Sequence, residues 1–242
     1  MTALSPHLQR VTFGGAELQS YEPGAPAASV RLLLPRPDDP GLVIPTWTGN
    51  EFLHRDGSRP TIRTYTPRRF HPSSSELDLD VVLHPGGAVP TWLASAPAGV
   101  EVGIAGPGRG YEIDPHAASV VLIGDESAIP AISQLLEHLP PTAEVAVRIE
   151  VVRPDARHDL PSHPGARVEW LIRPPSSSPG ATLVTAVEAL DLAPDARVWA
   201  AGEAASMQRI RRHLFDARAL PRRAAVVRGY WKVGRSGEDE AD

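Results

Sequence analysis

Three side chains that can bind a ligand stand close together in the stretch RTYTPRRF, residues 63–70. In an extended chain, Arg63 and Tyr65 point to one face and Thr66 points to the other. An arginine can pair with a phosphate through two parallel hydrogen bonds, and a tyrosine ring offers a flat apolar surface. Thr66, held extended before Pro67, can bring a hydroxyl or an N–H to the edge of a ring. The stretch suits a ligand with a phosphate and a flat ring, although spacing alone favours a plain strand with exposed arginines.

A glycine-rich turn follows in HPGGAVPTW, residues 84–92. Gly86 and Gly87 permit a close approach of the backbone, and the residues after them can begin a short helix. Free N–H groups at the start of a helix suit a pyrophosphate. The alternative is an ordinary hairpin turn, which the motif by itself favours. His84 is then a structural residue or a hydrogen-bonding partner of a ligand rather than a catalytic group.

Two further segments, LIGDESAIPAI (122–132) and WAAGEAAS (199–206), combine the end of a strand with acidic residues. In the first, Asp125 or Ser127 can cap the following helix, with Pro130 in its first turn. A helix then begins at the carboxyl end of a strand, where nucleotides bind to open parallel sheets. The negative charges argue against a tight phosphate cradle, so the acids contact ribose hydroxyls or the ring, or merely cap the helices. Neither a G-x-G-x-x-G fingerprint nor a P-loop is present.

The single lysine of the chain, Lys232, lies beside two aromatic residues in GYWKVGR (229–235). All other basic residues, apart from histidine, are arginines, so arginine is the ordinary surface cation of this chain and Lys232 stands out. The segment is either the solvated basic end of a strand or an aromatic lid with cations for an acidic ligand. Arg31, in SVRLLLP (29–35), could join these cations if the ends of the two halves of the chain meet.

The motifs must be positioned by secondary structure, and the first half of the chain is predicted to form strands. In the first half of the chain, short runs bounded by Pro, Gly, Asp or Ser predict strands over 29–35, 61–67, 77–84 and 100–107. In LDLDVVL, Leu77, Leu79 and Val81 should face one way, and Asp78 and Asp80 the other. Several strands with almost no helical pattern predict a small antiparallel barrel, for which we expect six strands.

In the second half of the chain, strands and helices alternate. The patterns predict strands over 119–126, 144–152, 167–172, 197–203 and 224–231, and helices over 128–139, 182–190 and 205–215. This alternation predicts a doubly wound parallel sheet with helices on both faces. We expect a barrel domain over residues 1–115 and an α/β domain over residues 116–242, with a disordered tail from about residue 236.

The composition excludes several classes of function. With 42% hydrophobic and 22% charged residues, the chain is typical of a soluble globular protein, and its net charge of −5 gives no general attraction to nucleic acid or to anionic membranes. It has no cysteine, so redox chemistry would need an organic cofactor or a metal held by N and O ligands, and we predict no metal site. No signal peptide or membrane-length apolar run is recognisable, and we expect a cytoplasmic monomer.

In this order, RTYTPRR, the HPGG…W segment, GPGRGYEIDP, GDESAIPAI, WAAGEAA and GYWKVGR resemble the siderophore-interacting proteins. These are FAD-containing ferric-siderophore reductases of the ferredoxin-reductase-like group. Each motif alone is modest, but six in order, over residues 61–235, are specific. The resemblance implies an FAD-binding barrel followed by an NAD(P)H-binding sheet domain. It also implies that NADH or NADPH reduces the bound FAD, which then reduces a ferric siderophore and releases Fe(II).

The resemblance implies roles for single residues as well. Arg63 would hold the FAD phosphates, Tyr65 would pack on the isoalloxazine and Thr66 would lie near its reactive edge, so Tyr65 and Thr66 are the catalytic candidates. The second segment that would bind the flavin comprises His84, Gly87, Ala88 and Trp92. The residues that would bind the nicotinamide nucleotide are Asp125, Glu126, Ser127, Gly202 and Glu203. The basic site that would bind the siderophore comprises Lys232, with Arg31 and Arg109.

Pro90 is the main departure from the family pattern, which usually has a serine there, with a hydroxyl and an N–H that could serve a pyrophosphate. Thr91 is a possible substitute for the hydroxyl. Two alternative functions therefore stay open. One is an NAD(P)H:flavin or quinone oxidoreductase on the same scaffold, which an apolar pocket around Lys232 would favour. The other is a siderophore- or nucleotide-binding protein that has lost FAD and is not an enzyme.

Overall fold

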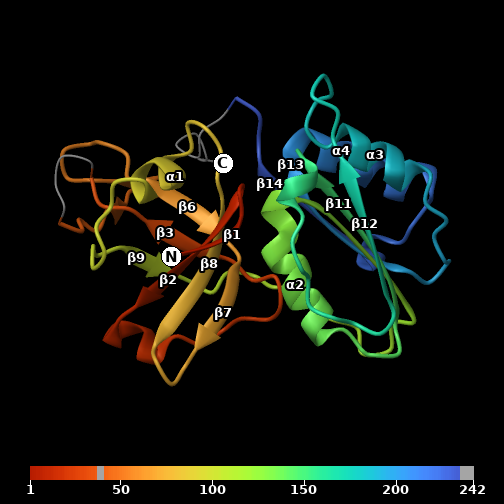
Figure 1. Cartoon of the computed structure of the whole chain (residues 1–242), viewed down its shortest axis with the longest axis horizontal. Helices are drawn as coiled ribbons and strands as arrows, with labels where there is room; N and C mark the ends of the chain where they lie inside the picture. The colour runs from red at the N-terminus through yellow and green to blue at the C-terminus, as the bar shows by residue number, and fades with distance from the viewer. Residues whose placement is uncertain (37–40, 235–242) are drawn as a thin grey trace.

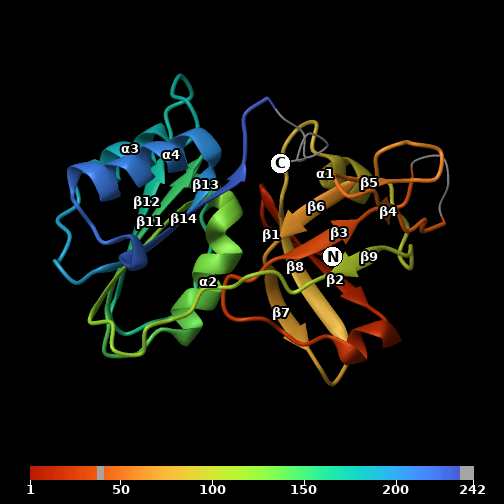
Figure 2. The ribbon, with the colours of Figure 1, turned by 180° about the vertical axis from the view of Figure 1, so that it is seen from behind.

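The structure is a computed structural model that describes residues 1–36 and 41–234. Its elements form two lobes that lie side by side, and the chain passes from one to the other between β9 and β10 (Figure 1). Figure 2 shows the same two lobes from behind. The predicted disordered tail from about residue 236 lies outside the described residues, and the predicted domain boundary between residues 115 and 116 stays a prediction.

The first lobe, called the barrel lobe below, is built from antiparallel strands. One sheet has the order β1-β2-β8-β7, a second has the order β6-β3-β9, and β4 pairs with β5 in a hairpin. The bounds are β1 Thr2–Ser5, β2 Leu8–Gly14, β3 Val30–Leu33, β4 Thr46–Trp47, β5 Phe52–Leu53, β6 Ile62–Tyr65, β7 Pro67–His71, β8 Glu76–Val82, α1 Ala88–Leu93 and β9 Gly103–Ala105. The predicted antiparallel architecture is confirmed; six strands were expected, and the described residues of this lobe form nine, β1 to β9.

The stretch around Pro67 differs from its prediction. The strand was expected to end at Pro67, but β6 ends at Tyr65 and a new strand, β7, begins at Pro67 in the other sheet. Proline lacks an N–H and is tolerated as the first residue of a strand, here beside a shift in register between Pro67 and Arg69. Thr66 therefore lies where the chain passes from one sheet to the other.

The alternating residues of β8 lie as predicted. The apolar ones are each 0% exposed and belong to the core of the barrel lobe: Leu77, Leu79 and Val81. The acidic ones face the opposite side, yet Asp80 is only 4% exposed. The reason is Arg10 of β2, which donates hydrogen bonds of 2.7 and 2.9 Å to the two oxygens of Asp80. The charged face of β8 is thus covered by neighbouring side chains.

The second lobe, called the sheet lobe below, holds a five-stranded parallel sheet of order β12-β11-β10-β13-β14. The bounds are β10 Ser119–Asp125, α2 Ile129–His138, β11 Glu144–Val151, β12 Ala166–Ile172, α3 Ala181–Glu188, β13 Arg197–Glu203, α4 Ala204–Arg212 and β14 Ala225–Trp231, with a π-helical turn over His213–Ala217. All predicted strands and helices of this half are present. The strand order reverses at β10, so the predicted doubly wound sheet is confirmed.

Helices cover both faces of the parallel sheet. On one face, α3 and α4 contribute Leu183 and Ile210, each 0% exposed, to a common core. On the other face, α2 packs through residues such as Leu135, and this core also includes Ala27 and Tyr111 of the barrel lobe. The helix α2 therefore lies between the parallel sheet and the barrel lobe (Figure 1). No helix in the described part of the chain is both long and apolar enough to cross a membrane.

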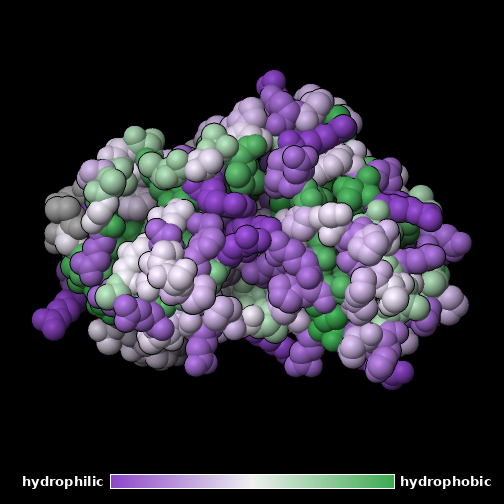
Figure 3. Space-filling model, turned by 60° about the horizontal axis from the view of Figure 1, so that its bottom comes forward, coloured by the Kyte–Doolittle hydropathy of each residue, from purple (hydrophilic) through white to green (hydrophobic). Residues whose placement is uncertain are grey.

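Polar contacts join the two lobes beside this shared core. Gln134 of α2 accepts a hydrogen bond from the Ala27 N–H at 2.8 Å and donates one to the Pro67 carbonyl at 2.6 Å. Arg228 of β14 donates to the carbonyls of Ala27 and Gly110 at 3.3 and 2.9 Å. Figure 3 shows hydrophilic side chains gathered along the middle of one face of the molecule. The lobes are thus held in one arrangement by both apolar and polar contacts.

Candidate functional site

Arg63 of β6 carries a guanidinium that is available to a ligand. Its cross-strand neighbour in β3 is Leu32, while Tyr65 faces Val30, so Arg63 and Tyr65 share one face of the sheet as their spacing predicted. Within the described residues Arg63 has no carboxylate partner, and its Nη1 donates to the neighbouring Ile62 carbonyl at 2.8 Å. A half-buried guanidinium without an acidic partner attracts an anion such as a phosphate.

Tyr65 packs against the core of the barrel lobe, and so does Trp92 of α1. Burial raises the pKa of the Tyr65 hydroxyl to about 12, so this side chain is neutral at any physiological pH. The segments over 63–66 and 84–92, which are far apart in the sequence, therefore meet at the same apolar core.

Thr66 connects the two lobes. It is 6% exposed and lies beside Tyr230 of β14, whose pKa is raised by burial and lowered in part by the neighbouring Thr66 side chain. The Tyr230 ring in turn packs edge-on against Trp199 of β13, with ring centroids 6.3 Å apart. The end of β6 therefore lies beside Tyr230, near the carboxyl end of β14.

The turn before α1 leaves backbone open to a ligand. Gly86 has a φ of +77°, and nothing lies within 4 Å of the point where a side chain would begin. A side chain on Gly87 would lie 2.7 Å from the ring of the exposed His84, so Gly87 makes room for this ring. A short helix does follow, the alternative to the hairpin turn that the motif by itself favoured, and it begins at Ala88 without a side-chain cap. Pro90 lies in its first turn, where a missing N–H breaks no helical hydrogen bond, but it removes one donor from this end of the helix.

Asp125, the last residue of β10, is the centre of a hydrogen-bond network at the carboxyl edge of the parallel sheet. Its Oδ1 accepts from the N–H and the hydroxyl of Ser127 at 3.0 and 2.5 Å. Its Oδ2 accepts from the Glu203 N–H at 2.9 Å and from the Trp231 indole N–H at 2.8 Å. Burial nevertheless raises the pKa of the Asp125 carboxyl above its ordinary value. Asp125 thus ties the end of β10 to β13 and β14.

The other residues predicted to bind a nucleotide at this edge also make contacts within the protein. A side chain on Gly202, which has a φ of +157°, would come within 2.6 Å of Asp125 Oδ2, so Gly202 makes room for that carboxylate. Glu203 caps α4 by accepting a hydrogen bond from the Ser206 N–H at 2.8 Å. Glu126 accepts from the Val152 N–H at 3.0 Å, and burial raises the pKa of its carboxyl. The predicted nucleotide residues do gather at one edge, but their oxygens already serve the protein.

The three predicted cations come from three different parts of the chain. Lys232 directly follows β14, is exposed, and makes no hydrogen bond or ion pair within the described residues; the chain runs from here towards the barrel lobe (Figures 1 and 2). Arg31 faces Thr64 across β3 and β6, on the opposite face from Arg63, and its guanidinium lies 5.9 Å from the Phe52 ring centroid. Arg109 is exposed. No contact joins the three cations in the part of the chain that the structure describes.

The structure adds residues that the sequence did not single out. Tyr230 and Trp231 were noted only as aromatics beside Lys232. In the structure, Tyr230 packs against Trp199, and Trp231 donates a hydrogen bond to Asp125. Glu150, at the end of β11, is 4% exposed and accepts hydrogen bonds from the start of α3. In the sequence, the one feature that could have identified these residues was their position at the carboxyl ends of predicted parallel strands.

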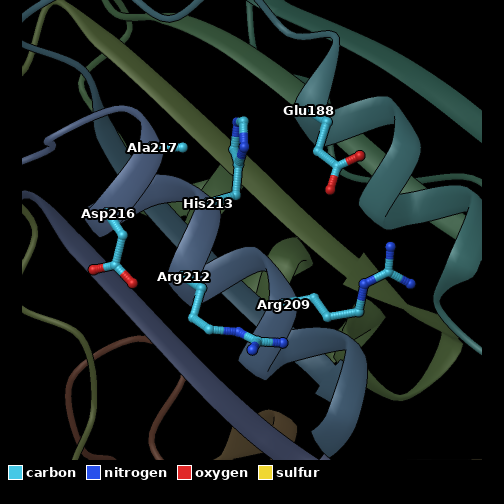
Figure 4. A pocket seen from close by; sticks show the side chains of 6 residues that line it. All are labelled: Glu188, Arg209, Arg212, His213, Asp216 and Ala217. Atoms are coloured by element: carbon cyan, nitrogen blue, oxygen red, sulfur yellow. The ribbon is translucent and has the colours of Figure 1, made fainter.

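A hollow of about 300 Å³ lies away from these residues, at the ends of α3 and α4 (Figure 4). Glu188 of α3 lines it on one side, and residues of α4 and of the π-helical turn line the other: Arg209, Arg212, His213, Asp216 and Ala217. None of the predicted site residues contributes to it.

Comparison with known proteins agrees with this geometry. Residues 1–111 match the model of the siderophore-interacting FAD-binding domain, and residues 117–234 match the model of the siderophore-interacting protein. Ferric vibriobactin reductase ViuB of Vibrio cholerae is 31% identical over 97% of this chain and 88% of its own length. The crystal structure of a siderophore utilization protein from T. fusca, 33% identical, superposes with a TM-score of 0.83 over 96% of this chain and 90% of that one. The crystal structure of the siderophore-interacting protein SipS from Aeromonas hydrophila is 29% identical in sequence. It superposes with a TM-score of 0.76 over 95% of this chain and 93% of that one.

The fold and the matched domains define a flavin-binding barrel joined to a doubly wound sheet. The chain belongs to the siderophore-interacting protein family. The residues present fit FAD: the Arg63 guanidinium is unpaired by any described carboxylate, and the backbone around Gly86 is open beside the uncapped start of α1. Arginine and free N–H groups are the donors that a pyrophosphate requires.

The contact between Thr66 and Tyr230 is expected to couple the stabilities of the two lobes. Thr66→Val and Tyr230→Phe each remove one hydroxyl at nearly constant volume, and each should lower the free energy of unfolding by about 1 kcal/mol. The double variant should lose little more than either single one, with a coupling energy of about 0.5–1.5 kcal/mol. Urea unfolding followed by circular dichroism measures this. Thr185→Val, which changes an exposed hydroxyl on α3, is the control. Strictly additive losses would show that the contact does not form.

Proposed function

We propose that this chain uses FAD to pass electrons from NADH or NADPH to a ferric siderophore, so that iron leaves the chelate as Fe(II). The observation that carries the proposal is the junction of the two lobes, in which Gln134 of α2 binds the Ala27 N–H and the Pro67 carbonyl at 2.8 and 2.6 Å. This junction holds the chain after β6 against a doubly wound sheet domain, and such sheets bind nucleotides at their carboxyl edge. The printed name of the relative ViuB, ferric vibriobactin reductase, supports a siderophore substrate. We propose a monomer that acts in the cytoplasm.

In this proposal the chain's own residues position the reactants. Arg63 provides a positive charge with parallel N–H donors for a phosphate. Tyr65 stacks on a flat ring and exchanges no proton, because its pKa of about 12 keeps it neutral. Thr66 and Tyr230 close the seam between the lobes and exclude water from it. FAD, when bound, supplies the redox chemistry by accepting a hydride and passing on single electrons.

The ferric siderophore is the substrate, and its charge determines how this chain would attract it. Lys232 is exposed and has no partner in the described residues, so its ammonium is free to meet an anionic chelate. An ammonium is a compact point charge that does not demand one fixed geometry, which allows chelates of different shapes. Fe(II) is a softer ion than Fe(III) and binds hard oxygen donors less tightly, so reduction weakens the chelate.

The visible absorbance spectrum of the purified protein tests the proposal. We expect a flavin spectrum, either as purified or after addition of FAD, that bleaches under anaerobic NADH or NADPH and recovers when a ferric siderophore is added. Recovery with a quinone but not with the siderophore would instead favour a quinone reductase. Absence of flavin binding would favour a binding protein without FAD. In that case Pro90→Ser, which restores an N–H in the first turn of α1, tests whether the proline is responsible.

Lys232 is expected to act on the siderophore and not on FAD. Lys232→Ala should lower kcat/KM for an anionic ferric siderophore by about tenfold, as expected for loss of one charged contact, with FAD affinity unchanged. Because Lys232 is the only lysine, acetylation of amines should reproduce this loss in the native chain and have no further effect on Lys232→Ala. Arg167→Ala, an exposed cation on β12, is the control. Unchanged kinetics over a series of anionic siderophores would exclude this role of Lys232.

A further inference from the structure

Each helix that begins at the carboxyl edge of the parallel sheet already binds a carboxylate of this chain. At the turn leading into α2, Asp125 accepts from the Ser127 N–H at 3.0 Å. At α3, Glu150 accepts from the N–H groups of Gly180 and Leu183 at 2.7 and 3.1 Å. At α4, Glu203 accepts from the Ser206 N–H at 2.8 Å. The three acids are 9%, 4% and 4% exposed, so all three are built into the protein.

These carboxylates prevent the usual mode of dinucleotide binding at this edge. The N–H groups and the positive end of the helix dipole at a helix start are what normally attract a phosphate. Here the carboxylates accept hydrogen bonds from one or two N–H groups at each of the three helix starts, and a phosphate bound at the same place would be repelled by their charge. The phosphates of a dinucleotide must therefore find their positive charge in side chains.

The arginines that can supply this charge follow β11 and β12. Arg173 is held in place: its backbone N–H donates to the Val151 carbonyl at 3.0 Å and its Nη1 donates to the Ser177 carbonyl at 3.1 Å. Arg153, two residues beyond β11, has a side chain that is 66% exposed, and its Nε lies 3.3 Å from Asp155. Arg157 lies four residues further and is exposed. The main-chain bond from Arg173 to Val151 shows that the ends of β11 and β12 lie together.

The position of these arginines in the sheet points to one part of the ligand. β11 is the strand that follows β10 along the chain and lies beside it. In doubly wound sheets, an acid near the end of this second strand binds the ribose 2′-hydroxyl of NAD, whereas an arginine there accommodates the 2′-phosphate of NADP. In this chain the acid at the end of β11, Glu150, is occupied by α3 and forms an ion pair with Arg173 at 3.9 Å, so the more exposed Arg153 is the cation available to a phosphate. The acids that remain nearby are Glu126, which binds the Val152 N–H, and Asp155.

We propose that the chain selects NADPH over NADH by binding the 2′-phosphate at Arg153, in the loop beside Arg173, and that no helix start on this edge holds a dinucleotide phosphate. This inference rests on the proposed function, because it names the electron donor of the same reaction. A guanidinium provides parallel N–H donors and a permanent charge, which is what a terminal phosphate requires.

Binding of nucleotide fragments tests the inference without flavin turnover. The probes are 2′,5′-ADP and 5′-AMP, which differ by the 2′-phosphate, titrated into the FAD-loaded protein by calorimetry. We expect 2′,5′-ADP to bind at least tenfold more tightly. Arg153→Ala should weaken 2′,5′-ADP binding by about 10- to 100-fold, as expected for loss of a charge-assisted pair, and leave 5′-AMP unchanged. Asp155→Asn, which removes the acid beside Arg153, should strengthen 2′,5′-ADP binding a few-fold.

Controls separate this inference from the proposed function. Arg167→Ala lies on β12 at the end far from Arg173 and should change neither probe. Arg173→Lys keeps the charge but loses the fork of donors, and should weaken 2′,5′-ADP binding without the risk of uncapping α3. Equal affinity for the two probes, or binding of neither, would overturn the inference. If NADH then still bleached the flavin, the proposed function would stand. If the variants changed 2′,5′-ADP binding as expected but neither NADH nor NADPH bleached the flavin, the inference would stand and the proposed function would fail.

Discussion

Replacing Arg63 with alanine should weaken FAD binding by about 100-fold or more. Arg63 has no carboxylate partner among the described residues, and it shares a face of β6 with Tyr65. A phosphate held by the fork of a guanidinium gains charge-assisted hydrogen bonds worth about 1.5–3 kcal/mol each. Loss of one or two of these corresponds to the expected change in affinity.

FAD affinity can be measured by fluorescence titration of the flavin into the apo-protein. Arg69→Ala is the matched control, because Arg69 belongs to the same stretch but its side chain is 57% exposed and lies 3.3 Å from Glu137, a surface pair of little energetic value. Arg63→Lys should lie between the wild type and Arg63→Ala, since lysine keeps the charge and loses the fork. If Arg63→Ala bound FAD as tightly as the wild type does, the arginine would belong to the ordinary surface of the barrel.

Replacing Asp125 with alanine should lower the free energy of unfolding by about 3–5 kcal/mol, because several hydrogen-bond donors would lose their acceptor together. The donors are the N–H and hydroxyl of Ser127, the N–H of Glu203 and the indole of Trp231. Since this network joins the ends of β10, β13 and β14, the loss should also impair reduction of the flavin by NADPH. Asp191→Ala, at an exposed position, should have no comparable effect in the same unfolding experiment.

The pH dependence of stability distinguishes the charge of Asp125 from its shape. Burial raises the pKa of this carboxyl above 3.8 in the folded state. The contribution of this one group to stability is therefore fully present below pH 3.8, and it decreases as the pH rises through the higher folded-state value. Asp125→Asn has the same shape and cannot ionise, so it should remove this part of the pH dependence. The free energies of unfolding of the two proteins are measured at a series of pH values. If they differed by the same amount at every pH, the carboxyl of Asp125 would not titrate in this range.

The sheet lobe could be predicted closely from the sequence, while the barrel lobe could be predicted only in part. The helix expected over 128–139 is α2, Ile129–His138, because its apolar stripe is repeated locally and buried on one side. The strand β7 was missed because its sequence, PRRFH, is polar. Arg68 in that strand donates hydrogen bonds of 3.0 and 2.7 Å to Glu137 of the sheet lobe, so its polarity serves a contact with another part of the chain.

By itself the sequence determined the order of the elements and the chemical types available: a single lysine, no cysteine, and acids at the carboxyl ends of β10, β11 and β13. The tertiary structure decided which of these groups are free. Asp125 and Glu150 can be taken for ligand-binding acids in the sequence, but they accept hydrogen bonds from N–H groups 78 and 30 residues away. The spacing of residues along the chain carries no information about such partners, because a hydrogen bond depends on distances in space that only the packed sheets and helices establish.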